Sequence, residues 1–215
     1  MSESIIMKIT NPKVENYMNT LLENRASIYK EVENYAQSIN FPIIEPLVGV
    51  LLNQYAKMIN AKRILELGSG FGYSALWFSD EIDEQTEIIC TDFKEENKKL
   101  AESYFKKAGI KTKIKFKLGD AIKILDEIEG DFDIIFNDVE KEDYPEVFKK
   151  SIPKLRKGGL LITDNTLWYG KVADSKINDY QTAGSREYNR LAFTDSRVLS
   201  VILPLRDGIT ISLKL

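Results

Sequence analysis

The sequence predicts an α/β protein with a mainly parallel, seven-stranded sheet, helices on both faces and a helical cap at the N-terminal end. Short β-rich runs alternate with longer amphipathic stretches, which is the pattern of parallel strands joined by helices. Glycines stand where these helices should stop, at Gly109, Gly130 and Gly158-Gly159. A chain of 215 residues with 43% apolar content is large enough for one full core, so we expect a single domain over residues 1–215.

The N-terminal part, from about residue 12 to residue 60, is predicted to form two or three helices. Two prolines, Pro42 and Pro46, interrupt it and force an extended turn over residues 41–46. We therefore divide the chain into a helical cap (1–60) and an α/β core (61–215). The cap could line a substrate site.

The core is predicted to contain five parallel strands followed by an antiparallel pair. The last two β-rich runs are joined by only a few residues, which is too short a connection for a parallel crossover. The parallel strands are expected at residues 63–67, 87–92, 113–118, 133–137 and 160–163, the intervening helices at 73–81, 94–108, 121–129 and 143–155, and the final pair at 197–202 and 209–215.

Composition excludes several classes of function. A net charge of −3 and an acidic pI give no overall electrostatic footprint for a nucleic acid or an anionic membrane. A local run of lysines between Lys106 and Lys117 is most simply a solvated helix end and strand face. Histidine is absent, which removes serine-histidine triads, histidine-ligated zinc and imidazole bases. Any general base must be lysine, carboxylate, tyrosine or a bound hydroxide.

The chain carries features of a cytoplasmic protein. Its single cysteine, Cys90, lies in an apolar run and cannot form an intrachain disulfide. The first residues, Met1 to Ser4, lack a basic stretch followed by an apolar one, and no apolar run approaches the roughly 20 residues needed to span a bilayer. We therefore expect a soluble, unexported protein with no membrane partner.

The first chemical motif is a strand that runs into a glycine turn, Gly68-Ser69-Gly70-Phe71-Gly72, and opens a helix. Glycine lets backbone amides approach a ligand closely, so such a turn suits a nucleotide-containing cofactor. A dinucleotide-binding fingerprint would need glycine at position 73, which is Tyr73, so a dehydrogenase is disfavoured. The spacing Gly-x-Gly-x-Gly after an acidic residue favours S-adenosylmethionine.

Acidic residues after consecutive strands complete this cofactor site. Glu66 is expected to face the methionine end of the cofactor, Asp92 to accept both ribose hydroxyls, and Asp120-Ala121 to lie beside the adenine. Each piece alone has a simpler interpretation, since a glycine turn can be only a turn and an acidic residue at a strand end can be only a helix cap. Three such features after consecutive strands together favour cofactor binding.

The second motif follows the fourth and fifth strands, at the carboxyl edge where open α/β sheets bind ligands. Asp138, Asp164 and Asn165 offer only oxygen ligands, which suits Mg²⁺ or another hard divalent cation such as Ca²⁺ or Mn²⁺. Lys141 could then remove a proton, because a nearby divalent cation disfavours the protonated form of an amine. The simpler interpretations are an exposed Asp138–Lys141 ion pair and a cap formed by Asp164-Asn165.

These motifs resemble the cation-dependent O-methyltransferases, a family that includes catechol O-methyltransferase and caffeoyl-CoA O-methyltransferase. The resemblance covers roughly residues 43–215 and is best at residues 65–68, 72–74, 133–141, 158–159, 163–170 and 203–208. It implies a Rossmann-like methyltransferase fold in which Asp138, Asp164 and Asn165 hold Mg²⁺ and Lys141 is the catalytic base. It also implies cofactor contacts at Ile44, Glu66, Gly68, Ser69, Ser74, Asp92, Ala121 and Asp138.

By this resemblance, a hydroxyl coordinated to Mg²⁺ and deprotonated by Lys141 attacks the sulfonium methyl of S-adenosylmethionine. Family members often have Ile-Asp-Ala-Asp-Lys where this chain has Asn137-Asp138-Val139-Glu140-Lys141, a difference that bears on substrate preference. Trp168 and Tyr169 are expected either to form a wall against a flat substrate ring or to contact a second subunit, since bacterial relatives commonly form homodimers through this region.

The sequence leaves the substrate open. The first hypothesis is a small aromatic vicinal diol. The second is tRNA, because the short chain, the early helices and residues 42–46 resemble the bacterial branch that methylates 5-hydroxyuridine at the wobble position. A dimer could then form a basic groove. A cofactor-binding protein without catalysis is a third alternative, which the intact metal and base positions disfavour. The residues expected in that groove are Lys106, Lys107, Lys111, Arg186 and Arg190.

Overall fold

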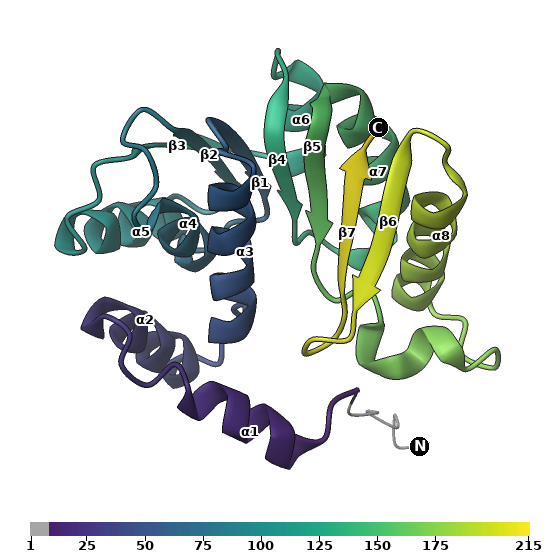
Figure 1. The fold of residues 1–215 in the computed structure, drawn as a ribbon, viewed down its shortest axis with the longest axis horizontal. Helices are drawn as coiled ribbons and strands as arrows, with labels where there is room; N and C mark the ends of the chain where they lie inside the picture. Colours follow the sequence, from purple (N-terminus) through teal and green to yellow (C-terminus); the bar gives the residue numbers. More distant parts are fainter. Residues whose placement is uncertain (1–8) are drawn as a thin grey trace.

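The computed structural model describes residues 9–215 and contains a seven-stranded sheet in the order β3-β2-β1-β4-β5-β7-β6 (Figure 1). Strands β1 to β5 are parallel, whereas β7 is antiparallel to both β5 and β6. The predicted fold class is therefore confirmed, including the antiparallel last strand. The strands are β1 (Arg63–Leu67), β2 (Glu87–Asp92), β3 (Lys113–Leu118), β4 (Phe132–Asn137), β5 (Leu155–Thr163), β6 (Val198–Leu203) and β7 (Ile209–Lys214).

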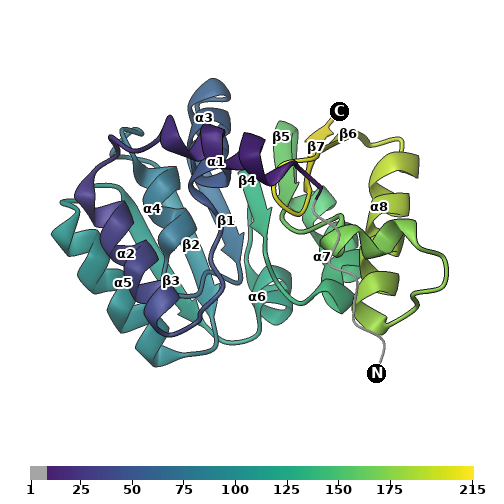
Figure 2. The same cartoon turned by 90° about the horizontal axis from the view of Figure 1, so that it is seen from below.

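Helices cover both faces of this sheet (Figure 2). Side chains alternate along each strand, so Ile64 packs under α2 to α5 while its neighbour Leu65 packs under α6 to α8. Both side chains are fully buried, as expected for a strand covered on two sides. The helices are α1 (Pro12–Thr20), α2 (Ser27–Ser38), α3 (Pro46–Met58), α4 (Tyr73–Ser79), α5 (Glu95–Lys107), α6 (Ala121–Glu127), α7 (Tyr144–Lys154) and α8 (Tyr180–Thr194).

Helices α1 to α3 form the N-terminal cap, as predicted. Pro46 begins α3, a position where its missing N–H is not needed. Helix α3 approaches α4 closely, because a Cβ on Gly49 would overlap the indole ring of Trp77. Helix α1 lies near the turn between β6 and β7, to which Thr10 Oγ1 donates a 3.0 Å hydrogen bond at Pro204 O (Figure 1). The cap thus reaches the C-terminal hairpin.

Two details differ from the sequence expectations. Gly158 and Gly159 do not stop a helix; they lie inside β5, which begins at Leu155 instead of residue 160. A Cβ on Gly159 would lie 2.9 Å from Arg156 O and 3.0 Å from Phe132 O. Glycine is therefore required here, beside the register shift in the pairing of β5 with the start of β4. Helix α8 was not anticipated.

The expectations about membranes and export have different outcomes. Within residues 9–215, no helix is long and apolar enough to cross a membrane. The residues on which the absence of an export signal was judged, Met1 to Ser4, lie outside the described part of the chain.

Candidate active site

A cavity of about 430 Å³ opens at the carboxyl ends of β1 to β4, beneath the extended segment 41–44 of the cap. This is the edge at which ligands bind in open α/β sheets. Phe41 and Ile43 from the cap line it, so the cap borders this cavity. Eight of the nine predicted cofactor residues line this cavity: Ile44, Gly68, Ser69, Ser74, Asp92, Asp120, Ala121 and Asp138.

The glycine turn is fixed against the ends of the neighbouring strands. Gly68 has φ +84°, and a Cβ there would lie 2.5 Å from Asp138 O, so only glycine fits between β1 and β4. Thr91 holds the turn from the other side: its carbonyl accepts from Ser69 N at 2.8 Å, and its hydroxyl accepts from Gly68 N at 3.1 Å. Sequence reasoning missed Thr91, whose only signal is its place directly before Asp92.

Glu66 is the predicted cofactor residue that does not line the cavity. Its carboxyl group is fully buried, and it accepts hydrogen bonds from the Ser74 hydroxyl and from the Cys90 thiol. Burial raises the pKa of Glu66 to about 8, so the carboxyl group is largely protonated at neutral pH. Glu66 therefore reaches the cavity through Ser74, which it orients.

Asp92 and Asp120 act as local caps and also line the cavity, so the two interpretations that the sequence left open, a cap and a cofactor contact, are compatible. Asp92 Oδ1 accepts from Lys94 N at 2.7 Å, and Asp120 Oδ1 accepts from Ile122 N at 2.8 Å at the start of α6. These contacts are local caps. Both residues also line the cavity, at the ends of β2 and β3, so capping holds each carboxylate where a ligand can reach it.

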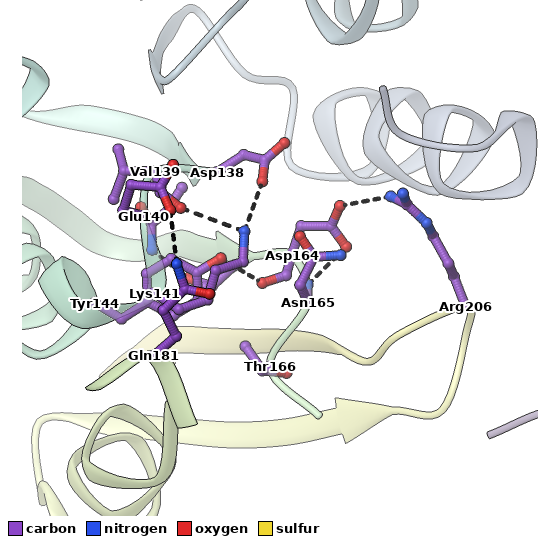
Figure 3. A network of polar contacts seen from close by, with 12 residues as sticks. Asp138, Val139, Glu140, Lys141, Tyr144, Asp164, Asn165, Thr166, Gln181 and Arg206 are labelled. Carbon is purple, nitrogen blue, oxygen red and sulfur yellow. Dashed lines mark hydrogen bonds and ion pairs between the residues drawn. The ribbon is translucent and has the colours of Figure 1, made fainter. Parts of the chain in front are cut away.

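The candidate metal ligands lie together past the ends of β4 and β5 (Figure 3). Asp138 and Asn165 line the cavity, whereas Asp164 is fully buried behind them. Burial and the neighbouring Asp164 raise the pKa of Asp138 to about 7. A cation bound between the two carboxylates would offset their mutual repulsion.

Lys141 lies beside these carboxylates. Its Nζ is 3.6 Å from Asp138 Oδ1, and its side chain is only 11% exposed (Figure 3). The residue belongs to a short 3₁₀ helix, Lys141–Asp143, which is backed by α8 so tightly that a Cβ on Gly184 would overlap Lys141 O. The Nζ also lies 5.4 Å from the centre of the Trp168 ring, a cation–π contact. The amine is thus held at one edge of the cavity.

Arg206 is a site residue that sequence reasoning missed. It comes from the turn between β6 and β7, lines the cavity, and donates from its guanidinium to Asp164 Oδ2 at 3.1 Å. Its Nε lies 3.8 Å from Glu45 Oε1, so it also connects the cap to the candidate metal site. Its only sequence signal was its position inside residues 203–208, one of the segments that resemble the family.

The donor set fits a hard divalent cation in its chemistry. Within residues 9–215 no group of three or more His, Cys, Asp or Glu side chains is arranged to hold a metal ion, and the candidate set has two carboxylates and one amide. All three residues supply oxygen, as Mg²⁺ and Ca²⁺ require. Carboxyl groups also outnumber cations here, since Glu45, Asp138, Asp164 and Asp207 surround only Lys141 and Arg206.

The predicted basic groove does not form on one subunit. Lys107 and Lys111 pair with Glu31 and Glu84 near α5, while Arg190 pairs with Glu187 on α8, at the far end of the sheet (Figure 1). Arg186, which was also expected in this groove, is part of a local network. Its guanidinium donates to four backbone carbonyl groups between residues 171 and 177 and thereby ties this loop to α8.

Trp168 and Tyr169 do not line the 430 Å³ cavity. The Trp168 ring packs near Lys141, and the Tyr169 side chain is half exposed. Their expected roles as a substrate wall or a subunit contact therefore stay predictions.

Comparison with known proteins gives consistent results. The sequence profile of the O-methyltransferase family matches residues 19–215. Caffeoyl-CoA O-methyltransferase 2 from Populus trichocarpa is 37% identical over 175 residues, which cover 76% of this chain and 71% of the relative. Caffeoyl-CoA O-methyltransferase 1 from Eucalyptus globulus is 36% identical over 174 residues, with the same coverage of 76% and 71%.

Solved structures show the same fold. An O-methyltransferase from Bacillus cereus in complex with SAH superimposes with a TM-score of 0.85 at 25% identity, covering 94% of this chain and 97% of that one. The O-methyltransferase TomG from Streptomyces achromogenes, in complex with SAM, gives a TM-score of 0.84 at 25% identity, covering 94% and 96%.

Proposed function

The chain belongs to the O-methyltransferase family and is an S-adenosylmethionine-dependent methyltransferase, and from this premise we propose a more specific activity. The protein transfers the methyl group to a hydroxyl of a small aromatic vicinal diol, with Mg²⁺ as the divalent cation. The observation that carries this proposal is the position of Lys141 Nζ, 3.6 Å from Asp138 Oδ1 at the edge of the cofactor cavity.

The cation would be held by Asp138, Asp164 and Asn165. When bound there, Mg²⁺ would lower the pKa of a substrate hydroxyl and offer two positions to adjacent oxygens, as a vicinal diol requires. Arg206 and Tyr144 keep Asp164 in place: Arg206 donates to its carboxylate, and the Tyr144 hydroxyl donates to its carbonyl at 2.8 Å. Arg206 and Tyr144 thus orient Asp164, a proposed cation-binding residue that is itself buried.

Lys141 accepts the proton of the attacking hydroxyl in this proposal. Its amine faces Asp138, and its backbone is fixed by α8, so the base cannot move far from the substrate oxygen. The residues of the glycine turn, Ser74 and Asp92 would hold the cofactor, which would supply the methyl group. Positioning of two reactants in this way supplies much of the rate enhancement expected for methyl transfer.

A small substrate agrees better with the site than tRNA does. The cavity lies under the cap segment, with Phe41, Phe71 and Phe93 supplying aromatic walls for a flat molecule. Of the basic residues expected to dock RNA, Lys107, Lys111 and Arg190 are paired with acidic partners, and Arg186 is bound to backbone carbonyl groups. We therefore rank the aromatic diol first.

The test is methyl transfer from labelled S-adenosylmethionine to a panel of catechols, with Mg²⁺ or with a chelator, alongside bulk tRNA. We expect label in catechols, loss of that label with chelator, and none in phenols that carry a single hydroxyl, because these cannot fill two positions on the cation. Label in tRNA alone would overturn the assignment of substrate. Chelator-resistant transfer to catechols would overturn the role of the cation.

We also propose that the protein is a homodimer in the cytoplasm. Strand β6 is an edge strand whose Leu199 and Val201 are 65% and 48% exposed, next to the buried Ile211 of β7, so an apolar sheet face is left uncovered. A second copy of the chain would bury it. Sedimentation equilibrium should give twice the mass of the chain, and a monomer at all concentrations would contradict the dimer.

A cytoplasmic location is supported by the buried free thiol of Cys90.

A further inference from the structure

We infer that Asp207 is a positioning residue that holds the loop after β5 in a strained conformation and thereby places Asn165 and Trp168 around Lys141. Asp207 lies in the turn between β6 and β7, about forty residues after the loop that it contacts. This inference rests on the proposed function, since it assigns a purpose to Asn165 as a cation ligand.

The loop at residues 165–170 is unusually strained. Asn165, Trp168 and Tyr169 have φ values of 53°, 45° and 54°, in the left-handed region that residues other than glycine rarely adopt. For Trp and Tyr, which have no polar group close to the backbone to favour this conformation, it costs free energy. Such a run persists only where the surrounding structure holds it in place.

Asp207 provides the main restraint on this loop. Its carboxylate accepts a hydrogen bond from Tyr169 N, and its carbonyl accepts one from Leu167 N at 2.9 Å. The next residue, Gly208, accepts from Thr166 N at 2.9 Å through its own carbonyl. Three amide groups of the loop are therefore bound by two consecutive residues of the turn.

The Asp207 side chain lies near Arg206 and Lys141 but makes a hydrogen bond only to the loop, among residues 9–215. It is only 5% exposed, and its Oδ2 atom is buried with no hydrogen-bond partner among residues 9–215. A carboxylate buried with one oxygen unsatisfied is costly, and an amide or an apolar side chain would fold more easily there. The hydrogen bond from Tyr169 N is the contact that accounts for an acceptor oxygen at this position.

The loop carries two groups that face the candidate active site. Asn165 lines the cavity beside Asp138, and the Trp168 ring lies 5.4 Å from the Nζ of Lys141. Release of Tyr169 N would let the left-handed residues relax to ordinary backbone angles and would move both groups. Asp207 thus acts on the cation site and on the base without touching either.

Hydrogen exchange tests this inference without any ligand. Asp207→Ala should increase amide exchange in peptides that cover residues 165–170, with no change at the glycine turn. Asp207→Asn keeps an oxygen that can accept from Tyr169 N and should restore slow exchange. Unchanged exchange in Asp207→Ala would overturn the inference.

Titration with Mn²⁺, followed by electron paramagnetic resonance, tests the consequence for the cation site. Asp207→Ala should weaken Mn²⁺ binding by about 10- to 100-fold, the usual effect of losing an outer partner of a metal site. Binding of S-adenosylmethionine, measured calorimetrically, should not change. Equal Mn²⁺ affinity in Asp207→Ala and the wild type would overturn the positioning role. If the wild type bound no Mn²⁺, the proposed cation would be wrong, while the exchange experiment would still decide whether Asp207 holds the loop.

A second substitution covers the case in which Asp207→Ala folds poorly. Tyr169→Asn places in the left-handed conformation a residue that tolerates it better. In the Asp207→Ala background this change should partly restore slow exchange over residues 165–170. Absence of any rescue, together with fast exchange throughout the protein, would show a general folding role and would overturn the inference.

Discussion

The two halves of the active site are built in different ways. The cofactor half, at the ends of β1 to β3, is made from short segments in which the binding residues are neighbours in sequence, as in the turn from Gly68 to Gly72. The half around Lys141 is assembled from β4, β5, α8 and the β6–β7 turn, which are distant in sequence. Substitutions in the first half should therefore affect binding of the cofactor, and those in the second half should affect the chemical step.

Lys141→Ala offers the strongest test of this division. Loss of a general base lowers turnover by about 10²- to 10⁴-fold, and we expect that effect on kcat. Affinity for S-adenosylmethionine should be unchanged, because Asp92 and Asp120 follow β2 and β3, which β1 separates from β4 and Lys141. Steady-state kinetics and calorimetry measure the two quantities.

Lys141→Arg is the matched control for this prediction. Arginine keeps the positive charge but does not release a proton at accessible pH, so it should be as inactive as Lys141→Ala. Near-normal turnover in Lys141→Arg would show that only the charge is needed, and the assignment of Lys141 as a base would be abandoned.

Two glycines, one in each half, sharpen the comparison. Gly68→Ala places a Cβ 2.5 Å from Asp138 O at a positive φ, which should destabilise the fold by about 1–3 kcal/mol and weaken cofactor binding. Gly184→Ala lies in α8, where alanine is the better helix former, but its Cβ would overlap Lys141 O. It should lower kcat with cofactor affinity retained.

Gly109→Ala is a control that introduces backbone strain without any steric overlap of the new Cβ. Gly109 has φ +67°, but a Cβ there would meet nothing within 4 Å. It should cost some stability and alter neither cofactor affinity nor kcat. If Gly184→Ala changed cofactor affinity as much as Gly68→Ala did, the two halves of the site would not be separable.

The same division explains what the sequence could reveal. The glycine turn, the acidic residues after β2 and β3, and most strand limits are local patterns, and the structure places them as predicted. Arg206, Asp207 and Arg186 act through contacts with segments far away in sequence, and their residue types fit equally well on a solvated surface. Gly158-Gly159 was misplaced for a related reason, since a glycine needed for a close approach between strands looks like one that ends a helix.

Glu66, which lies beneath the cofactor half, should make the stability of the protein depend on pH. Burial raises its pKa to about 8 from an ordinary value of 4.5, so the folded protein retains a proton that the unfolded chain releases in this range. Glu66 should therefore make the free energy of unfolding fall as pH rises from about 5 to about 8, by about 1.4 kcal/mol per pH unit beyond the contributions of Asp138 and Asp207, whose pKa values are also raised. Glu66→Gln, which cannot ionise, should remove the Glu66 contribution and make this slope shallower in urea unfolding.

Glu87→Gln is the control for Glu66→Gln, because the hydrogen bond from Lys115 lowers the pKa of Glu87 and moves its titration below this range. It should leave the slope between about pH 5 and about pH 8 as it is in the wild type. A wild-type protein whose stability did not change across this range would mean that Glu66 is ionised in the folded state. The Ser74 hydroxyl and the Cys90 thiol would then stabilise a buried carboxylate. The cofactor half of the site would in that case have a negative charge at Glu66, directly behind Ser74.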